Sequence, residues 1–160
     1  MQEIEYENSM SAAETACFEA LCTRLGYVAG KNAFLGVNAG VPDCMVFDIG
    51  SNYTGDLNAF RAPCAHFRAQ ADFYNRDRAA LQRLVMRLRH LFPVDHDADK
   101  LGLRDDSPVI QFRLCVETSN PTALKTTEVP TGRDATPVPT WTMSAVFDVV
   151  FATPYQNENE

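Results

Sequence analysis

The stretch CAHFRAQADFYNRDRAALQRLVMRLRHLF, residues 64–92, changes its hydrophobic period once, and this change decides the fold. Over residues 65–73 the apolar side chains fall on every second position, which is the pattern of a strand with one covered face. Over residues 81–91 they recur every three to four positions, which is the pattern of an amphipathic helix. Asn75 or Asp77 is expected to cap that helix. The strand therefore leads directly into a helix that must fold back onto the apolar face of the strand.

The rest of the chain predicts one further helix and several strands. Ser11 and Glu14 have the spacing of a capping box, so a helix is expected over residues 12–25. Alternating apolar residues predict further strands, at 43–49, 109–117 and 141–151, with a short one near 34–37. The sequence thus predicts an α+β fold: a single domain in which an antiparallel four- to five-stranded sheet has two helices packed on one face.

The segments outside these elements are polar. Residues 1–10 are expected to form a flexible N-terminal arm, residues 11–155 the α+β domain, and residues 156–160 a flexible C-terminal tail. Residues 118–140 contain four prolines and seven threonines, which predicts a long loop that becomes ordered on binding a partner.

The composition narrows the class of protein. A net charge of −7 disfavours general affinity for nucleic acid or anionic membranes. The sequence has no apolar run long enough for a transmembrane helix, and its acidic start does not resemble a secretory signal. The five cysteines, an odd number without a CxxC pair, predict reduced and mostly buried thiols. One disulfide between Cys44 and Cys64, across neighbouring strands, stays open as an alternative.

Residues that could carry catalysis are sparse. The chain has no nucleophile-elbow, Walker or dinucleotide-binding pattern. Of its three histidines, His66, His90 and His96, the first two have no catalytic partner nearby in the sequence. A pairing in space with Cys115 or Cys64 stays open as an alternative. We therefore expect a protein that is not an enzyme, with no catalytic residue and no cofactor.

One acidic segment has the spacing of a calcium loop. Asp95, Asp97, Asp99 and Asp106 occupy the first, third, fifth and twelfth positions of such a loop. Lys100, however, occupies the sixth position, where the sharp turn of the loop needs glycine. The sequence therefore favours a solvated acidic loop, and no metal ligand is assigned.

A cluster of arginines is the most unusual feature of the chain. Residues 76–89 carry five arginines and one aspartate, so this segment is positive by four while the rest of the chain is negative by eleven. Either the arginines pair with acidic groups of their own chain, or the basic helix meets an acidic surface of a neighbouring copy. The candidate interface residues are Arg76, Arg78, Arg83, Arg87 and Arg89, together with Arg133 and Asp134 of the predicted loop.

The polar faces of the predicted strands also carry both signs of charge. Arg68, Arg113 and Asp148 belong to this set. Cross-strand ion pairs are one interpretation. A sheet face that lines a subunit interface or the lumen of a ring is the other.

The order of these elements and their patterns of apolar and polar residues resemble those of a known family. The segments are PDCMVFDIG (42–50), the long strand AHFRAQADFYN, the helix RDRAALQRLVMRLRHLF that follows it, and the closing SAVFDVVFATPY (144–155). Together with the first helix they resemble the tail terminator proteins of long-tailed bacteriophages, over about residues 11–155.

The resemblance implies a virion structural protein. Tail terminators form a ring, usually a hexamer, that caps the completed tail tube, ends its polymerisation and offers a surface to the head–tail connector. The implied partners are further copies of the chain, the tail tube protein and the connector protein, with DNA passing through the lumen. The implied location is the tail or neck of the virion, and the host cytoplasm during assembly. Other head–tail connector, neck or minor tail adaptor proteins look similar at this level and are the alternative.

Overall fold

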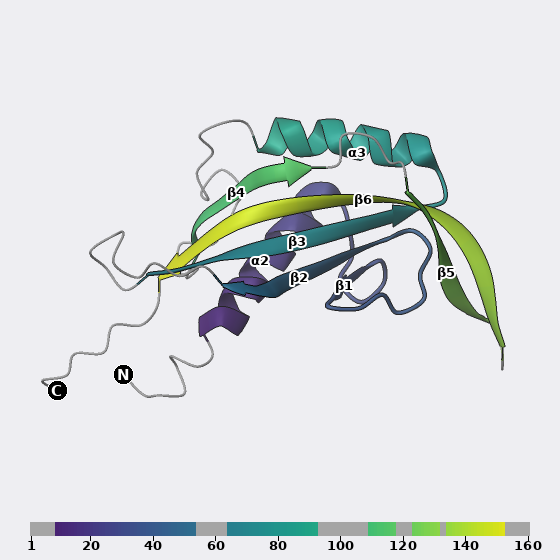
Figure 1. Cartoon of the computed structure of the whole chain (residues 1–160), viewed down its shortest axis with the longest axis horizontal. Coiled ribbons are helices and arrows are strands. Elements are labelled where there is room, and N and C mark those ends of the chain that lie inside the picture. The colour runs from purple at the N-terminus through teal and green to yellow at the C-terminus, as the bar shows by residue number, and fades with distance from the viewer. Residues whose placement is uncertain (1–8, 54–63, 93–108, 118–122, 132–133, 153–160) are drawn as a thin grey trace, which may run out of the picture.

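A computed structural model describes residues 9–53, 64–92, 109–117, 123–131 and 134–152. These residues form two helices and six strands, with three strands after each helix (Figure 1). In chain order they are α2 (Ser9–Leu25), β1 (Ala33–Leu35), β2 (Cys44–Tyr53), β3 (Cys64–Asn75), α3 (Arg78–Leu91), β4 (Val109–Glu117), β5 (Ala123–Thr131) and β6 (Asp134–Ala152). The chain forms a single α+β domain, as the sequence predicts.

The strands form one mostly antiparallel sheet in the order β1-β2-β3-β6-β4. The central pairing joins β3 to β6 over twelve register pairs, from Cys64 opposite Ala152 to Asn75 opposite Trp141. The short strand β1 is the exception, because it runs parallel to β2. β5 lies off this path and pairs with the first part of β6.

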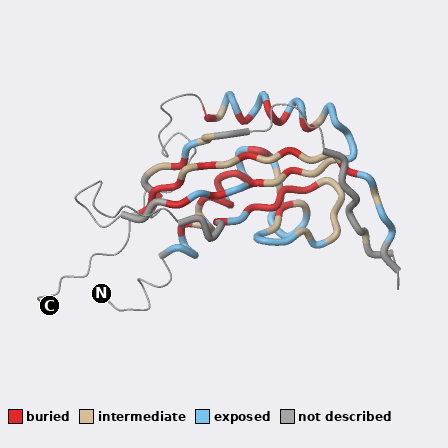
Figure 2. The backbone as a smooth tube through the Cα atoms, in the orientation of Figure 1, coloured by how far each residue is buried: buried red, intermediate tan, exposed pale blue. Residues whose placement is uncertain are grey.

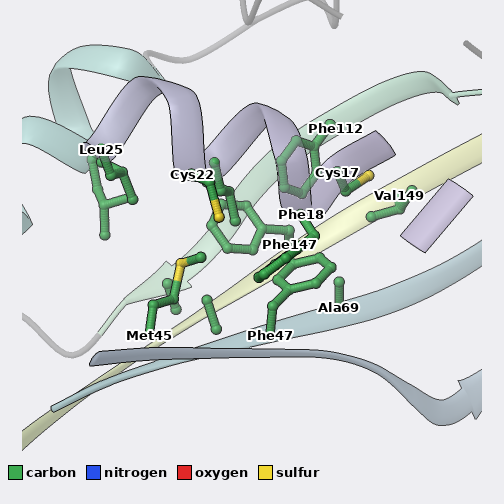
Figure 3. Close-up of a cluster of buried hydrophobic side chains, with 14 of the residues drawn as sticks. Cys17, Phe18, Cys22, Leu25, Met45, Phe47, Ala69, Phe112, Phe147 and Val149 are labelled. Carbon is green, nitrogen blue, oxygen red and sulfur yellow. The ribbon is translucent and has the colours of Figure 1, made fainter. Parts of the chain in front are cut away.

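One face of the sheet and the apolar sides of both helices share a single core. Alternate residues of β3 and β6 are buried, as the period-two pattern predicts, and Figure 2 shows these buried positions along the strands. From α3, Leu81, Leu84, Val85 and Leu88 join the same cluster. From α2, Cys17, Phe18 and Cys22 pack towards Phe47 and Phe147 (Figure 3).

The turn from β3 into α3 forms as expected. Asp77 is the N-cap, and its carboxylate accepts a hydrogen bond from the backbone N–H of Ala79 at 3.0 Å. Asn75 accepts one from the N–H of Asp77 at 2.8 Å. Each of these side chains satisfies a donor at the point where the chain changes from strand to helix.

The predicted capping box of the first helix is wrong. α2 begins at Ser9, so Ser11 already lies inside the helix. The Glu14 carboxylate instead accepts a hydrogen bond from the backbone N–H of Ile49 in β2, at 3.1 Å. The register between β2 and β3 shifts between Ile49 and Tyr53, so Glu14 tethers α2 to β2 where that irregularity begins.

The prediction of a long loop over residues 118–140 is also wrong in its main part. β5 and the start of β6 form a hairpin there, with nine register pairs from Ala123 opposite Thr142 to Thr131 opposite Asp134.

The alternative of a disulfide between Cys44 and Cys64 is also wrong. Cys44 is a free thiol opposite Tyr74, whereas Cys64 pairs with Ala152 at the far end of β3, about 33 Å along the strand.

Candidate functional site

The first arginine of the cluster has an acidic partner within the chain. The Arg76 guanidinium binds the Asp43 carboxylate, with its closest nitrogen and oxygen 2.8 Å apart, and the Arg76 backbone N–H donates to the same carboxylate at 2.9 Å. The side-chain hydrogen bond from Arg76 lowers the pKa of Asp43 below its ordinary value of 3.8. This pair fastens the start of β2 to the turn that follows β3.

Arg87 binds backbone carbonyl groups at the end of a helix and not a carboxylate. Its guanidinium donates to the carbonyl oxygen of Leu25 at 3.2 Å and to that of Arg24 at 3.0 Å. These carbonyls belong to the last turn of α2, where helix carbonyls lack partners within the helix and the helix dipole is negative. Arg87 therefore caps α2 from α3 and joins the two helices.

The other arginines lie on the exposed surface of α3. Arg83 approaches the Asp77 carboxylate at 3.8 Å, and both side chains are largely exposed, so this ion pair contributes little. The Arg78 guanidinium lies over the ring of Trp141, 5.6 Å from its centroid, where a cation–π attraction acts. Arg89 lies in the last turn of α3, where a positive charge suits the helix dipole.

The cluster therefore has two roles within its own chain. Arg76 and Arg87 tie α3 to β2 and to α2 by specific hydrogen bonds. Arg78, Arg83 and Arg89 are exposed and keep the outer side of α3 basic. Met86, 62% exposed, lies on the same outer side.

A groove runs between α3 and the end of α2. It has a volume of about 480 Å³, within the range of ligand-binding clefts. The side chains of Leu25, Leu81 and Leu84 form its floor, and Arg83 and Arg87 lie on its rim. Tyr27 lines it as well, and burial raises the pKa of its phenol to about 12, so the hydroxyl stays protonated at neutral pH. We call this cleft the α3 groove.

The outward face of the sheet carries paired charges. Asp148 of β6 has Arg68 of β3 as its register partner on one side and Arg113 of β4 on the other. The Arg68 guanidinium lies 3.6 Å from the Asp148 carboxylate, which confirms a predicted cross-strand pair. Further along, Ser144 donates a hydrogen bond of 2.6 Å to Asp72. On this face Asp148 therefore has an arginine as its partner, whereas Asp72 has a hydroxyl.

The hairpin of β5 and β6 extends beyond the rest of the sheet. β3 ends opposite Trp141, so residues 134–140 of β6 pair with β5 alone among the described strands. Figure 1 shows this two-stranded ribbon leading away from the helices and the other strands. Thr136, Pro137 and Pro139 are exposed on it. We call the ribbon, residues 123–140 as far as the structure describes them, the hairpin arm.

Two prolines determine how the hairpin arm can bind. Pro137 lies opposite Glu128 and Pro139 opposite Thr126, so the two nitrogens point to the same edge of β6. In an antiparallel ladder, pairs that exchange two hydrogen bonds alternate with pairs that exchange none. Because proline has no N–H, the arm keeps its ladder only if both prolines occupy the second kind of pair. The edge of β6 that faces away from β5 then lacks two donors, so it is a poor template for an added strand.

The remaining predicted residues fall in different places. Asp134 begins β6 at the end of the hairpin arm, opposite Thr131, while Arg133 lies outside the described residues. The acidic segment from Asp95 to Asp106, which includes His96, also lies outside them. His90 is exposed at the end of α3.

The buried thiols do not suit nucleophilic chemistry. Burial raises the pKa of Cys17, and it raises those of Cys22 and Cys44 to about 11, so these sulfurs stay protonated at neutral pH. Among the described residues, no group of three or more His, Cys, Asp or Glu side chains is placed to hold a metal ion. No helix in the described part of the chain is long and apolar enough to cross a membrane.

Comparison with known protein families and with curated protein sequences finds no match to this chain.

Proposed function

We propose that this chain is a non-enzymatic structural protein of a long-tailed bacteriophage, of the tail terminator kind. Copies assemble into a ring, a hexamer in the family it resembles. The ring caps the tail tube, ends its polymerisation and provides the surface that joins the head. Its partners are its own copies, the tube protein and the head–tail connector protein, and it resides in the virion tail or neck.

The observation that best supports this proposal is the hairpin arm. An isolated two-stranded ribbon is only marginally stable in water. The arm nevertheless extends over nine register pairs, most of them past the end of β3. A ribbon of this kind gains stability when its faces pack on another protein. The arm is thus suited to reach a neighbouring subunit or the adjacent ring of the tube.

The two sheet edges also favour assembly into a ring. At one edge β4 pairs only with β6, and at the other β1 covers three positions of the ten in β2, within the described part of the chain. Open edges tend to bind further chains. Because these two edges differ, contacts between copies run head to tail, and such contacts close into rings when the rotation between subunits allows it.

The separation of positive and negative charge within the chain also favours assembly into a ring. The outer side of α3 is basic in a chain whose remainder is negative by eleven charges. Opposite charges on different surfaces of one molecule favour an ordered head-to-tail contact and disfavour contacts between like surfaces.

Light scattering after size-exclusion chromatography tests the ring. We expect the mass of about six copies of the 17.8 kDa chain, either for the protein alone or after it is mixed with tail tubes of the phage that encodes it. A monomer under both conditions would overturn the proposal.

A variant of the hairpin arm tests tube binding separately from ring assembly. Thr136→Arg places a bulky charge on an exposed position of the arm and is expected to weaken tube binding while the ring keeps its mass. Gln82→Arg adds the same charge to the exposed side of α3 and is the matched control. Equal tube binding by the two variants would show that the arm does not contact the tube.

A further inference from the structure

Among the described residues that line the α3 groove, two are arginines and none is acidic. Arg83 and Arg87 lie one helical turn apart on this rim, so their Cβ atoms are about 6 Å apart. Within the described part of the chain, the one ion pair of Arg83 is the exposed contact with Asp77 at 3.8 Å. Arg87 donates to two carbonyls at the negative end of the α2 dipole, which offset part of its charge, and no carboxylate among the described residues pairs with it.

The floor of the groove contributes less to binding than its rim. Leu25, Leu81 and Leu84 are each at most 6% exposed, so a bound segment would cover little additional apolar surface there. The attraction of this groove for a partner is therefore mainly electrostatic. An acidic and extended polypeptide segment fits it best.

The chain itself contains such a segment. Residues 1–8, MQEIEYEN, carry Glu3, Glu5 and Glu7 and no lysine or arginine. In an extended chain, residues two positions apart point to the same side and are separated by about 6.5–7 Å. That spacing is close to the separation of the two rim arginines, so neighbouring glutamates can bind Arg83 and Arg87 in register.

The geometry points to a second copy as the donor of this segment. α2 begins at Ser9, and the groove lies at its other end, sixteen residues along the helix or about 24 Å away. Eight fully extended residues span at most about 26–29 Å. The segment of the same chain would have to run straight back along α2 and would bring about one residue to the groove. A segment from a neighbouring copy has no such restriction.

We infer that the α3 groove binds the acidic N-terminal segment, residues 1–8, of the next copy of the chain. This inference deepens the proposed ring and rests on it, because it names one of the contacts between neighbouring subunits. Each copy offers one groove and one segment, so in a closed ring every groove is occupied and every segment is bound. A single contact of this kind is weak, but ring closure lets several weak contacts act together.

A peptide-binding measurement tests the groove independently of assembly. The probe is a fluorescent peptide of residues 1–9, and the protein is the full chain with Glu3→Gln, Glu5→Gln and Glu7→Gln, whose own segment cannot compete. We expect saturable binding that weakens as salt rises, because these charges are exposed. Arg83→Glu should weaken the affinity roughly tenfold or more. Arg89→Glu, the same charge change in the last turn of α3, should have a much smaller effect.

Two peptide controls define the occupant. A peptide of residues 1–9 with all three glutamates changed to glutamine should not bind. A peptide of residues 153–160, which carries Glu158 and Glu160, should compete poorly. Equal binding by either control, or equal losses with Arg83→Glu and Arg89→Glu, would overturn the inference.

A mixing experiment distinguishes a neighbouring copy from the same chain. One full-length variant carries the three glutamate-to-glutamine changes, and the other carries Arg83→Glu. Neither should self-associate through this contact. At concentrations above the Kd measured with the peptide, the mixture should form one-to-one pairs in sedimentation, because one groove and one segment remain intact. Monomers in the mixture, with peptide binding intact, would assign the segment to its own chain and refute the contact between copies. If the peptide fails to bind but the wild-type ring forms, only this inference is wrong; if the peptide binds but no ring ever forms, the proposed function is wrong.

Discussion

Replacement of Arg87 by alanine tests whether α3 holds α2 through its end. The substitution removes two hydrogen bonds, of 3.2 and 3.0 Å, from the carbonyl oxygens of Leu25 and Arg24. A hydrogen bond from a charged group contributes about 1.5–3 kcal/mol when shielded, and a cation at an exposed helix C-terminus about 0.3–1 kcal/mol. Because Arg87 is exposed, its hydrogen bonds should contribute less than shielded ones. We therefore expect the free energy of unfolding to fall by about 1–2 kcal/mol.

Urea unfolding followed by far-ultraviolet circular dichroism measures this loss. The midpoint should fall while the slope stays constant, and for a chain of this size Tm should fall by about 2–8 °C. Arg83→Ala is the matched control one turn away, since its ion pair at 3.8 Å is exposed and should contribute less than about 0.5 kcal/mol. Arg87→Lys keeps the charge but loses the forked donor, so it should fall between the two. Equal midpoints for Arg87→Ala and Arg83→Ala would refute the capping role.

Three further predictions concern single contacts. Asp43 has a lowered pKa in the fold, so its ion pair stabilises the protein above about pH 4 and loses this effect as the pH falls; the stability gap between wild type and Asp43→Asn should therefore shrink on acidification, and a gap that is constant from pH 7 to pH 3 would contradict this. Glu14→Ala should speed hydrogen exchange at the Ile49 amide, whereas Glu14→Gln, which keeps an acceptor, should change it less; unchanged exchange in both would show that the bond is unimportant. In native protein at pH 8, mass spectrometry should find Cys115 alkylated well before the fully buried Cys44, and faster labelling of Cys44 would contradict its burial.

The local patterns of the sequence predict most of the body of the fold. The alternation over residues 65–73 and the stripe that begins at Leu81 identify β3, α3 and the face they share, because both patterns record which side of an element is covered. The sequence predicts Asp77 as one of two possible caps of α3. Such a cap is visible in the sequence because its hydrogen bond joins residues only two positions apart. These features depend on neighbours along the chain.

The features that the sequence analysis missed depend on distant residues. Arg87 and Leu25 are 62 positions apart, and Glu14 and Ile49 are 35 apart, so no periodicity indicates that they bind. Glu14 was assigned to a local cap because the capping-box spacing was present, and tertiary contact prevailed over it.

The hairpin arm was missed for a different reason. Its prolines and threonines have the composition of a loop, yet the prolines lie where a two-stranded ladder tolerates them. One signal in the sequence was available. Only two residues, beginning with Gly132, separate Thr131 from Asp134, which is the length and chemistry of a tight hairpin connection.

The length of tail tubes tests the proposed function most directly. Tails assembled by the phage without this protein would be measured by electron microscopy and compared with tails made in its presence. If the protein ends tube polymerisation, tubes made without it should vary in length, often be too long and remain unattached to heads. Uniform length should return when the protein is supplied. Tubes of normal, uniform length in its absence would contradict a terminator role, and failure only of head attachment would assign the chain to the neck or connector proteins.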